Sequence, residues 1–242
     1  MLLLFASTAF AAPKVPLRVV PAAADVPPGA PVEVAVVVTV PRGWHIYWEN
    51  PGQSGIPTDA TLRASSAGAP LAVDGPRWPV PARFEADGLY NYGYAGETAF
   101  VFTVTPLAEG PVTLAASVDW LLCKTACIPG SGEASATVTV RNSAPDAGAG
   151  KVARALAALP RPFAETGGTA RMVDGALELR LPRPFSLFPA TALEAVWAPV
   201  VAETAGGGVV VTTPVPAGPA RLVLGDAQGR GFTLDLPLPE SP

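Results

Sequence analysis

The fold class is decided by the stretch Val32-Glu33-Val34-Ala35-Val36-Val37-Val38-Thr39-Val40. Most of its side chains are β-branched, and such side chains favour extended backbone over helix. Pro31 precedes the stretch and Pro41-Arg42-Gly43 follows it, so turn-forming residues bound it on both sides. We therefore predict a β-strand here.

Three further stretches in the same part of the chain repeat this pattern. They cover residues 98–105, 112–120 and 134–140, where aliphatic or aromatic residues alternate with small or polar ones. A period of two is the signature of a strand with one buried face. Short strands of this kind, separated by turn residues, are typical of an antiparallel sandwich. We predict an all-β sandwich over residues 15–141.

The composition agrees with this prediction and excludes other classes of protein. The chain of 242 residues contains 29 prolines and 24 glycines, too many for long helices to dominate. Apolar residues make up 49% and charged residues 15%, so the chain can form packed cores and is not disordered by composition. The formal net charge of −4 leaves no basic surface for nucleic acid.

The second part of the chain is predicted to be a smaller β-rich domain over residues 151–242. Residues 142–150 are small, polar and turn-forming, and they indicate a linker. An alanine-rich helix is expected from Lys151 to Leu159, where Pro160 ends it. Strands are expected at residues 176–181, 209–213, 220–224 and 231–236. This part contains no cysteine or histidine, so any redox or metal chemistry must come from the sandwich.

The first 12 residues resemble the end of a secretory signal peptide. They form an apolar run that ends in Ala9-Phe10-Ala11, a small-x-small cleavage pattern. The usual positive residues before the run are missing, which suggests a start codon further upstream. The run is too short to cross a bilayer, and later apolar runs are interrupted, so we expect no transmembrane segment. An exported protein would hold its cysteines where disulfides persist.

The chain has only two cysteines, Cys123 and Cys127, with three residues between them. A structural disulfide that closes so short a loop would stabilise the folded state by only about 2 kcal/mol, through the entropy lost by the unfolded chain. Two cysteines this close are better suited to cycling between dithiol and disulfide. A structural staple and a metal site remain alternatives at this stage, because the spacing also occurs in copper-binding sites.

The surroundings of the pair predict a β-hairpin turn. Pro129-Gly130 and another strand follow the pair, so no helix is present to stabilise a thiolate as in thioredoxin-like proteins. Lys124 lies beside Cys123 in sequence and could favour the thiolate by its charge. We expect weaker activation of the thiol than in a strong oxidant.

Two aromatic segments could surround the cysteines. Gly43-Trp44-His45-Ile46-Tyr47-Trp48 is expected to form a strand that ends in Asn50-Pro51-Gly52. Alternation places His45 and Tyr47 on one face, away from a core-facing Trp44, Ile46 and Trp48. The alternative is that His45 and Tyr47 are ordinary surface or rim residues. Residues 87–94 form a glycine-rich aromatic loop that could cover a reactive disulfide, or could be a plain hairpin tip.

Taken in order, these segments resemble the amino-terminal periplasmic domain of DsbD-type protein-disulfide reductases. The resemblance rests on residues 43–48, on the loop 88–94 and on residues 120–130, from Trp120 to Gly130. The Trp-rich Asn-Pro-Gly segment and the C-x3-C pair are most similar to the ScsB subgroup, named for suppression of copper sensitivity. The resemblance covers residues 15–140 well and the second domain with weaker motifs.

The resemblance implies an immunoglobulin-like sandwich in the periplasm and a thiol–disulfide interchange activity with no cofactor. A membrane-embedded reductase would supply electrons, and periplasmic thioredoxin-fold proteins would accept them. Cys127 would form the mixed disulfide and Cys123 would resolve it. His45 and Tyr47 match two active-site tyrosines, so the histidine is a departure, and Lys124 and Trp120 would support the site.

The resemblance also implies a cap loop over the disulfide at residues 89–93. The aligned cap position is Asn91, next to Leu89, so Tyr90 or Tyr92 would supply the shielding ring. The chain lacks both the membrane segment and the carboxy-terminal thioredoxin-like domain of the full-length members, so separate proteins would supply them, or this is the soluble portion.

Two other classes of function remain as alternatives. A copper module could bind Cu(I) through Cys123, Cys127 and His45, since soft thiolates favour that ion. A non-catalytic sandwich with an inert staple would serve adhesion or assembly. Hydrolase and phosphate-binding motifs are not supported, because Gly52-Gln53-Ser54-Gly55 lacks the G-x-S-x-G spacing and Gly206-Gly207-Gly208 lacks the following Lys-Ser/Thr.

Overall fold

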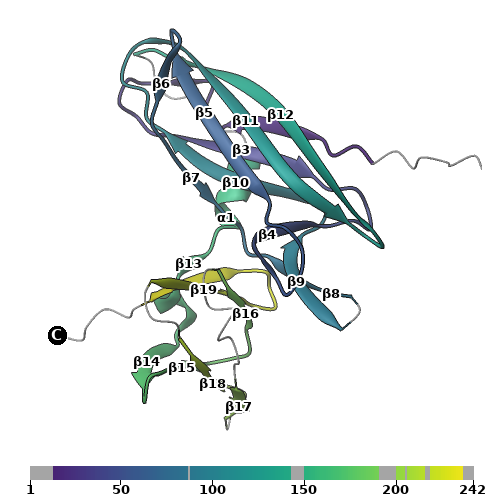
Figure 1. The fold of residues 1–242 in the computed structure, drawn as a ribbon. Helices are drawn as coiled ribbons and strands as arrows, with labels where there is room; N and C mark the ends of the chain where they lie inside the picture. The colour runs from purple at the N-terminus through teal and green to yellow at the C-terminus, as the bar shows by residue number, and fades with distance from the viewer. Residues whose placement is uncertain are drawn as a thin grey trace, which may run out of the picture.

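The structure is a computed structural model, and it describes residues 13–86, 88–142, 150–190, 200–204, 206–215 and 219–236. Strands dominate it, and they form two β-rich units (Figure 1). The predicted all-β class is confirmed. The signal-like residues 1–12 and most of the predicted linker, residues 143–149, lie outside the described residues.

The first unit is a sandwich of two sheets with a third, smaller sheet at one end. One sheet has the strand order β1-β3-β10-β7 and the other β2-β12-β11-β5-β6. The small sheet has the order β4-β9-β8. The strands are β1 (Leu17–Pro21), β2 (Asp25–Val26), β3 (Val32–Thr39), β4 (Ile46–Gly52), β5 (Asp59–Ser66), β6 (Ala69–Leu71), β7 (Val73–Arg77), β8 (Ala82–Ala86), β9 (Leu89–Tyr94), β10 (Glu97–Val104), β11 (Gly110–Cys123) and β12 (Cys127–Val140).

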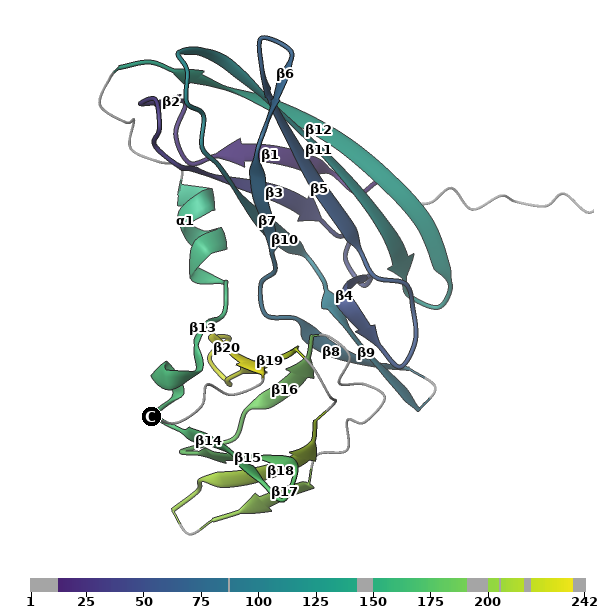
Figure 2. The ribbon, with the colours of Figure 1, turned by 60° about the vertical axis from the view of Figure 1, so that its left-hand side comes forward.

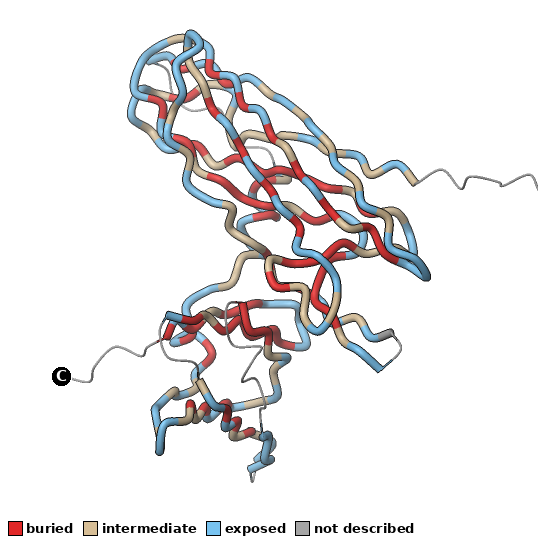
Figure 3. Tube along the Cα trace, viewed as in Figure 1, coloured by how far each residue is buried: buried red, intermediate tan, exposed pale blue. Residues whose placement is uncertain are grey.

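Strand β3 is the predicted 32–40 stretch, and it is buried on both faces. Val34, Val36 and Val38 belong to the core of the sandwich. Figure 3 shows buried residues, in red, along the strands of the first unit. Ala35 and Val37, on the opposite face, pack against helix α1 (Gly150–Ala157). A strand covered on both sides needs a continuous apolar run, which is why this stretch does not alternate.

Helix α1 contacts the sandwich. Its buried residues, Val152 and Ala155, pack on the outer face of β3 and β10, where they meet Val101. From sequence, this helix is expected to belong to the second domain. In the structure it covers a sheet of the first unit and leads from there into the second (Figure 2).

The long hairpin of β11 and β12 carries the cysteine pair. Its register runs from Gly110 opposite Val140 to Cys123 opposite Cys127. Val112, Leu114, Val118 and other alternate residues of β11 are buried in the core, as the period-two pattern predicted. The prediction that the cysteines lie at a hairpin turn is confirmed.

The second unit contains two four-stranded sheets around its own core. Their orders are β13-β20-β19-β16 and β14-β15-β18-β17, and all four predicted strands are present. The elements are β13 (Arg161–Pro162), a 3-10 turn (Phe163–Thr166), β14 (Thr169–Val173), β15 (Ala176–Leu181), β16 (Ser186–Pro189), β17 (Val200–Glu203), β18 (Val209–Pro214), β19 (Ala220–Gly225) and β20 (Gly231–Leu236). Leu177, Leu179, Leu222 and Leu224 are fully buried at the centre of this core.

The two units are packed against each other. Val80, between β7 and β8, inserts its methyl groups against Gly225 and Gly231, which face each other on β19 and β20. A Cβ on Gly231 would overlap Val80 Cγ2, so the absence of a side chain makes this contact possible. The Val80 N–H also donates to the Ala158 carbonyl at 3.4 Å.

A second group of contacts joins β4 and β9 to the second unit. The Phe188 ring lies edge-on to Trp48 and Tyr92, with ring centres 6.4 and 5.3 Å apart. The Arg221 guanidinium lies 3.2 Å from the Glu49 carboxylate. The small sheet therefore contacts the sandwich core on one side and the second unit on another.

Among the described helices, none has the length and apolar character needed to span a bilayer.

We expect Gly231→Ala to destabilise the protein by about 1–3 kcal/mol, because the added methyl group overpacks the joint with Val80. Denaturant unfolding measures the loss. Val80→Ala should recover part of that loss in the double variant, since it removes the overlapping methyl groups. Gly150→Ala is the matched control and should cost nothing, because its Cβ would meet open space at the start of α1. Equal losses from the two glycine variants would contradict this account.

Candidate functional site

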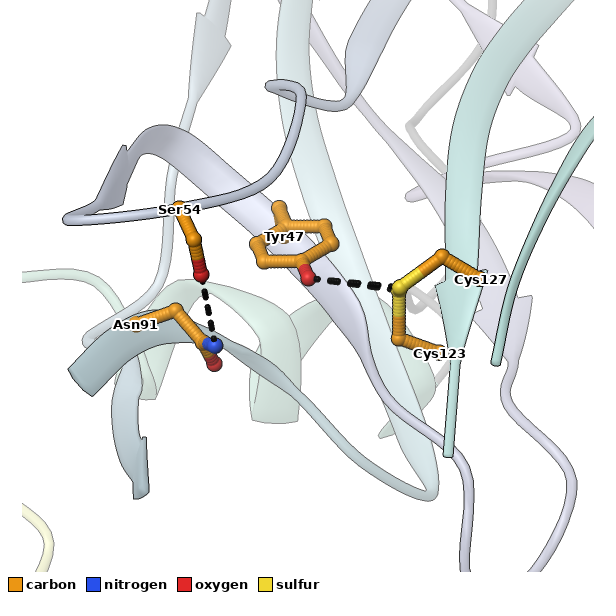
Figure 4. The surroundings of a disulfide bond; sticks show 5 residues. All are labelled: Tyr47, Ser54, Asn91, Cys123 and Cys127. Carbon is orange, nitrogen blue, oxygen red and sulfur yellow. Dashed lines mark hydrogen bonds between the residues drawn. A yellow bond between two sulfur atoms is a disulfide. The ribbon is translucent and has the colours of Figure 1, made fainter. Parts of the chain in front are cut away.

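Cys123 and Cys127 form a disulfide that closes the end of the β11–β12 hairpin (Figure 4). The two partners differ in accessibility. Cys123 is 2% exposed, whereas Cys127 belongs to the exposed turn. An approaching thiol can therefore reach the bond from the Cys127 side.

Strand β4 is held beside the disulfide by a pair of backbone hydrogen bonds. The His45 N–H donates to the Cys123 carbonyl at 2.9 Å, and the Cys123 N–H donates to the His45 carbonyl at 2.9 Å. Residues paired in this way project their side chains to the same side, and so does Tyr47 two residues later. Ile46 and Trp48 are buried in the core. The predicted separation of the two faces is confirmed.

Tyr47 contacts the sulfur atoms directly. Its hydroxyl donates to Cys123 Sγ at 3.2 Å and lies 3.7 Å from Cys127 Sγ. Tyr47 is only 3% exposed, and this burial raises the pKa of its hydroxyl. The hydroxyl therefore stays protonated at neutral pH and remains a donor to the buried sulfur.

His45 is half-buried among aromatic rings. It stacks on Phe84 with ring centres 4.4 Å apart and meets Tyr47 edge-on at 5.4 Å. Its Nε2 atom is buried and has no hydrogen-bond partner. Burial lowers the pKa of the imidazole from its ordinary value of 6.5, so the ring is neutral at pH 7. His45 therefore contributes an uncharged ring beside the disulfide.

The ring that covers His45 comes from β8. Phe84 lies opposite Asn91 in the β8–β9 pairing, and Tyr47 lies opposite Gly93 in the β4–β9 pairing. Phe84 and Asn91 are therefore on the same face of the small sheet as Tyr47 and His45. Asn91 is buried, and its amide donates to Ser54 Oγ at 3.5 Å. Phe84 cannot be recognised from sequence as a site residue, because one aromatic residue between Arg83 and Glu85 gives no signal by itself.

The tyrosines of the predicted cap loop lie on the other face of the same hairpin. Tyr92 packs against Trp48 and Phe188, and the Arg83 guanidinium lies 4.6 Å from the centre of the Tyr90 ring. The strand alternation of β9 sends these rings toward the second unit, while Asn91 points the opposite way. Leu89 is exposed at the hairpin tip. The ring stacked on His45 is thus Phe84 rather than Tyr90 or Tyr92.

Lys124 and Trp120, the other two residues predicted to support the site, point in different directions. Lys124 is exposed in the turn between the cysteines, and its side chain runs beside Gly43. Trp120 is three residues before Cys123 on β11, so it points to the opposite face, into the core. There its ring covers Gly130 and Gly132 of β12. Trp120 therefore packs against the hairpin from the core side, on the opposite face from the sulfur atoms.

The two sulfurs of the donor set proposed for Cu(I) are bonded to each other in a disulfide. Within the described residues, no group of three or more His, Cys, Asp and Glu side chains is placed to hold a metal ion. The His45 ring is instead stacked on Phe84.

We expect His45 to make the protein less stable in acid. The unfolded chain takes up a proton at the ordinary pKa of 6.5, whereas the folded imidazole resists it until lower pH. Stability should therefore fall as the pH drops through and below 6.5. His45→Phe keeps a ring on Phe84 without this titration, so denaturant unfolding between about pH 8 and about pH 5 should show a smaller loss in the variant. Parallel pH profiles would contradict the assignment.

Comparison with known proteins assigns the first unit of this chain to a family. Residues 15–139 match the family model described as "Thiol:disulfide interchange protein DsbD, N-terminal". The N-terminal periplasmic domain of ScsB from Proteus mirabilis is similar in structure, with a TM-score of 0.59 and 18% identity, over 87% of this chain and 89% of that one. No curated protein matches the chain.

More distant similarity extends to two chaperones. The E. coli chaperone DraB has a TM-score of 0.27 at 10% identity, over 92% of this chain and 98% of its own. The periplasmic chaperone SfaE has a TM-score of 0.26 at 9% identity, over 90% of this chain and 98% of its own. Because the family model covers more than half of the chain, this protein belongs to the family of DsbD amino-terminal domains, and its first unit has their immunoglobulin-like fold.

Proposed function

We propose that this protein is a periplasmic thiol–disulfide carrier. Its Cys123–Cys127 pair would take two electrons from a membrane-embedded reductase and pass them to thioredoxin-fold proteins. The observation that carries the proposal is the asymmetry of the disulfide, with an exposed Cys127 and a buried Cys123 that accepts a hydrogen bond from Tyr47. Membership of the DsbD amino-terminal family supports the same chemistry.

In the loading step, a thiolate of the donor attacks Cys127 Sγ, the accessible sulfur. The Cys123–Cys127 bond breaks, and its electron pair leaves with Cys123 as a thiolate, toward which the Tyr47 hydroxyl donates. The second donor thiolate then attacks the donor sulfur of the mixed disulfide. This releases Cys127 as a thiolate and leaves the donor oxidised to its own disulfide. Two electrons are transferred, and protons from water complete the dithiol.

In the unloading step, the Cys127 thiolate attacks a disulfide of the acceptor protein. One acceptor sulfur leaves as a thiolate, and a mixed disulfide joins Cys127 to the acceptor. The Cys123 thiolate then attacks Cys127 Sγ, restores the Cys123–Cys127 bond and releases the second acceptor thiolate. The acceptor has then gained two electrons, and the carrier has returned to the disulfide form.

A purely structural disulfide is less consistent with this geometry. The β11–β12 register already pairs fourteen residues on each strand, and it holds the hairpin end closed without the sulfur bond. A bridge over so short a loop adds about 2 kcal/mol at most by constraining the unfolded chain. The buried tyrosine hydroxyl beside the sulfur is better explained by a need to stabilise a reduced form.

The roles of the two cysteines can be tested by trapping. Cys123→Ala leaves the accessible Cys127 thiol without its resolving partner, so we expect it to accumulate a mixed disulfide with an oxidised thioredoxin-fold protein. Non-reducing electrophoresis and mass spectrometry measure the adduct. Cys127→Ala, which leaves only the buried thiol, is the matched control and should accumulate at least about tenfold less. Efficient trapping by Cys127→Ala alone would reverse the assigned roles.

The Tyr47 hydrogen bond should favour the reduced form, because a hydroxyl donates more strongly to a thiolate than to a disulfide sulfur. We expect Tyr47→Phe to shift the equilibrium with a glutathione redox buffer about three- to tenfold toward the disulfide. Tyr94→Phe is the matched control, because it removes a hydroxyl whose bond goes to the Pro79 carbonyl. It should lower stability and leave the redox equilibrium unchanged. Equal redox shifts in both variants would contradict a specific role for Tyr47.

A further inference from the structure

We propose that the second unit tunes the redox equilibrium of the disulfide through Asn50, a positioning residue that sets the place of Tyr47. The proposal rests on the redox function proposed above. It assigns a role to residues that are far from the cysteines in sequence and that do not touch the sulfur atoms.

The first link joins the second unit to β4. Asn50 Nδ2 donates to the Pro189 carbonyl of β16 at 2.6 Å, and Asn50 is 8% exposed. An amide that directs its NH2 group to this carbonyl must direct its oxygen the other way. That oxygen accepts a hydrogen bond from the Gly52 N–H at 3.1 Å. Asn50 thus connects the second unit to the turn that follows it.

The second link is the set of contacts that hold this turn against β9. Gly52 has a φ of +88°, and a Cβ there would lie 2.9 Å from Asn91 Cα and 3.0 Å from the Tyr90 carbonyl oxygen. The next residue, Gln53, donates its N–H to the same Tyr90 carbonyl at 3.0 Å. The Gln53 side-chain oxygen accepts the Tyr90 N–H, also at 3.0 Å. The turn therefore has one defined position on the small sheet.

The third link carries that position to the disulfide. Gly55, at the end of the turn, has a φ of +104°, and a Cβ on it would overlap the Tyr47 ring. The turn therefore packs directly against the ring whose hydroxyl donates to Cys123 Sγ (Figure 4). A continuous series of contacts runs from Pro189 through Asn50, the 52–55 turn and Tyr47 to the sulfur.

A hydrogen bond depends steeply on distance and angle, so a small displacement of the Tyr47 ring weakens its contact with Cys123. Loss of the Asn50 side chain would remove the hydrogen bonds to Pro189 and Gly52, so the turn would keep its bonds to Tyr90 but pack less firmly against the Tyr47 ring. The effect must then appear in the redox equilibrium and must depend on the Tyr47 hydroxyl. A merely structural role for Asn50 would change stability alone.

The test is a double-mutant cycle between Asn50→Ala and Tyr47→Phe, read out as the equilibrium of the full chain with a glutathione redox buffer. Asn50→Ala alone should shift this equilibrium about two- to fivefold toward the disulfide, less than the loss of the hydroxyl itself. In the Tyr47→Phe background, Asn50→Ala should cause no further shift. An unchanged equilibrium in Asn50→Ala, or equal shifts in both backgrounds, would overturn the proposal.

A control separates this effect from general loosening of the two units. Val80→Ala weakens the joint with Gly225 and Gly231 and leaves the Asn50–Pro189 hydrogen bond in place. It should lower the stability and leave the redox equilibrium unchanged. A shift as large as that of Asn50→Ala would show that any weakening of the interface suffices, which contradicts a specific role for Asn50.

A second variant at the same position keeps the proposal testable if Asn50→Ala does not fold. Asn50→Asp keeps an oxygen for the Gly52 N–H and, when ionised, loses the donor to Pro189, so it should shift the equilibrium in the same direction as Asn50→Ala. No shift in a folded Asn50→Asp variant would overturn the proposal. Failure of the wild-type disulfide to exchange with glutathione would instead refute the carrier function, so the two failures are distinguishable.

Discussion

The site depends on one backbone pairing, the two hydrogen bonds that join His45 to Cys123. They place β4 beside the end of the β11–β12 hairpin and set the register between them. Because side chains alternate along a strand, this register brings Tyr47 to the sulfur and leaves Ile46 and Trp48 in the core. A shift by one residue would exchange the two faces and remove the donor from the disulfide.

The same short strand connects three parts of the molecule. Trp48 joins the sandwich core, Tyr47 meets the disulfide, and Glu49 and Asn50 bind the second unit. Burial raises the pKa of the Glu49 carboxyl, and the Arg221 guanidinium opposes that shift. A displacement of one part would pass to another through this strand, because packed interiors have few voids to absorb it. Under the proposal made above, the second unit would act on the disulfide through this strand.

Local patterns allowed much of the fold and part of the site to be predicted. The β-branched run of β3, the alternation of β11 and the turn residues after Cys127 indicated the strands and the hairpin correctly. The alternation of β4 also separated His45 and Tyr47 from the core-facing side. Tyr90 and Tyr92, which the resemblance offered as shielding rings, lie on the other face of the small sheet from His45, because nothing local reveals which face of the β8–β9 hairpin lies on the side of the disulfide. Phe84, which stacks on His45, and Asn50, which binds Pro189, were not identified as site residues.

Local sequence patterns are enough to predict the strand content, the position of the cysteines at a turn and the two different faces of β4. These features follow from φ/ψ preferences and side-chain alternation over a few neighbouring residues. Contacts between distant segments set which rings surround the disulfide, why Cys123 is buried while Cys127 is exposed, and how the second unit reaches the site. Those contacts join residues between 39 and 172 positions apart, and their register is set by packing of whole sheets, for which a single sequence carries no local signal.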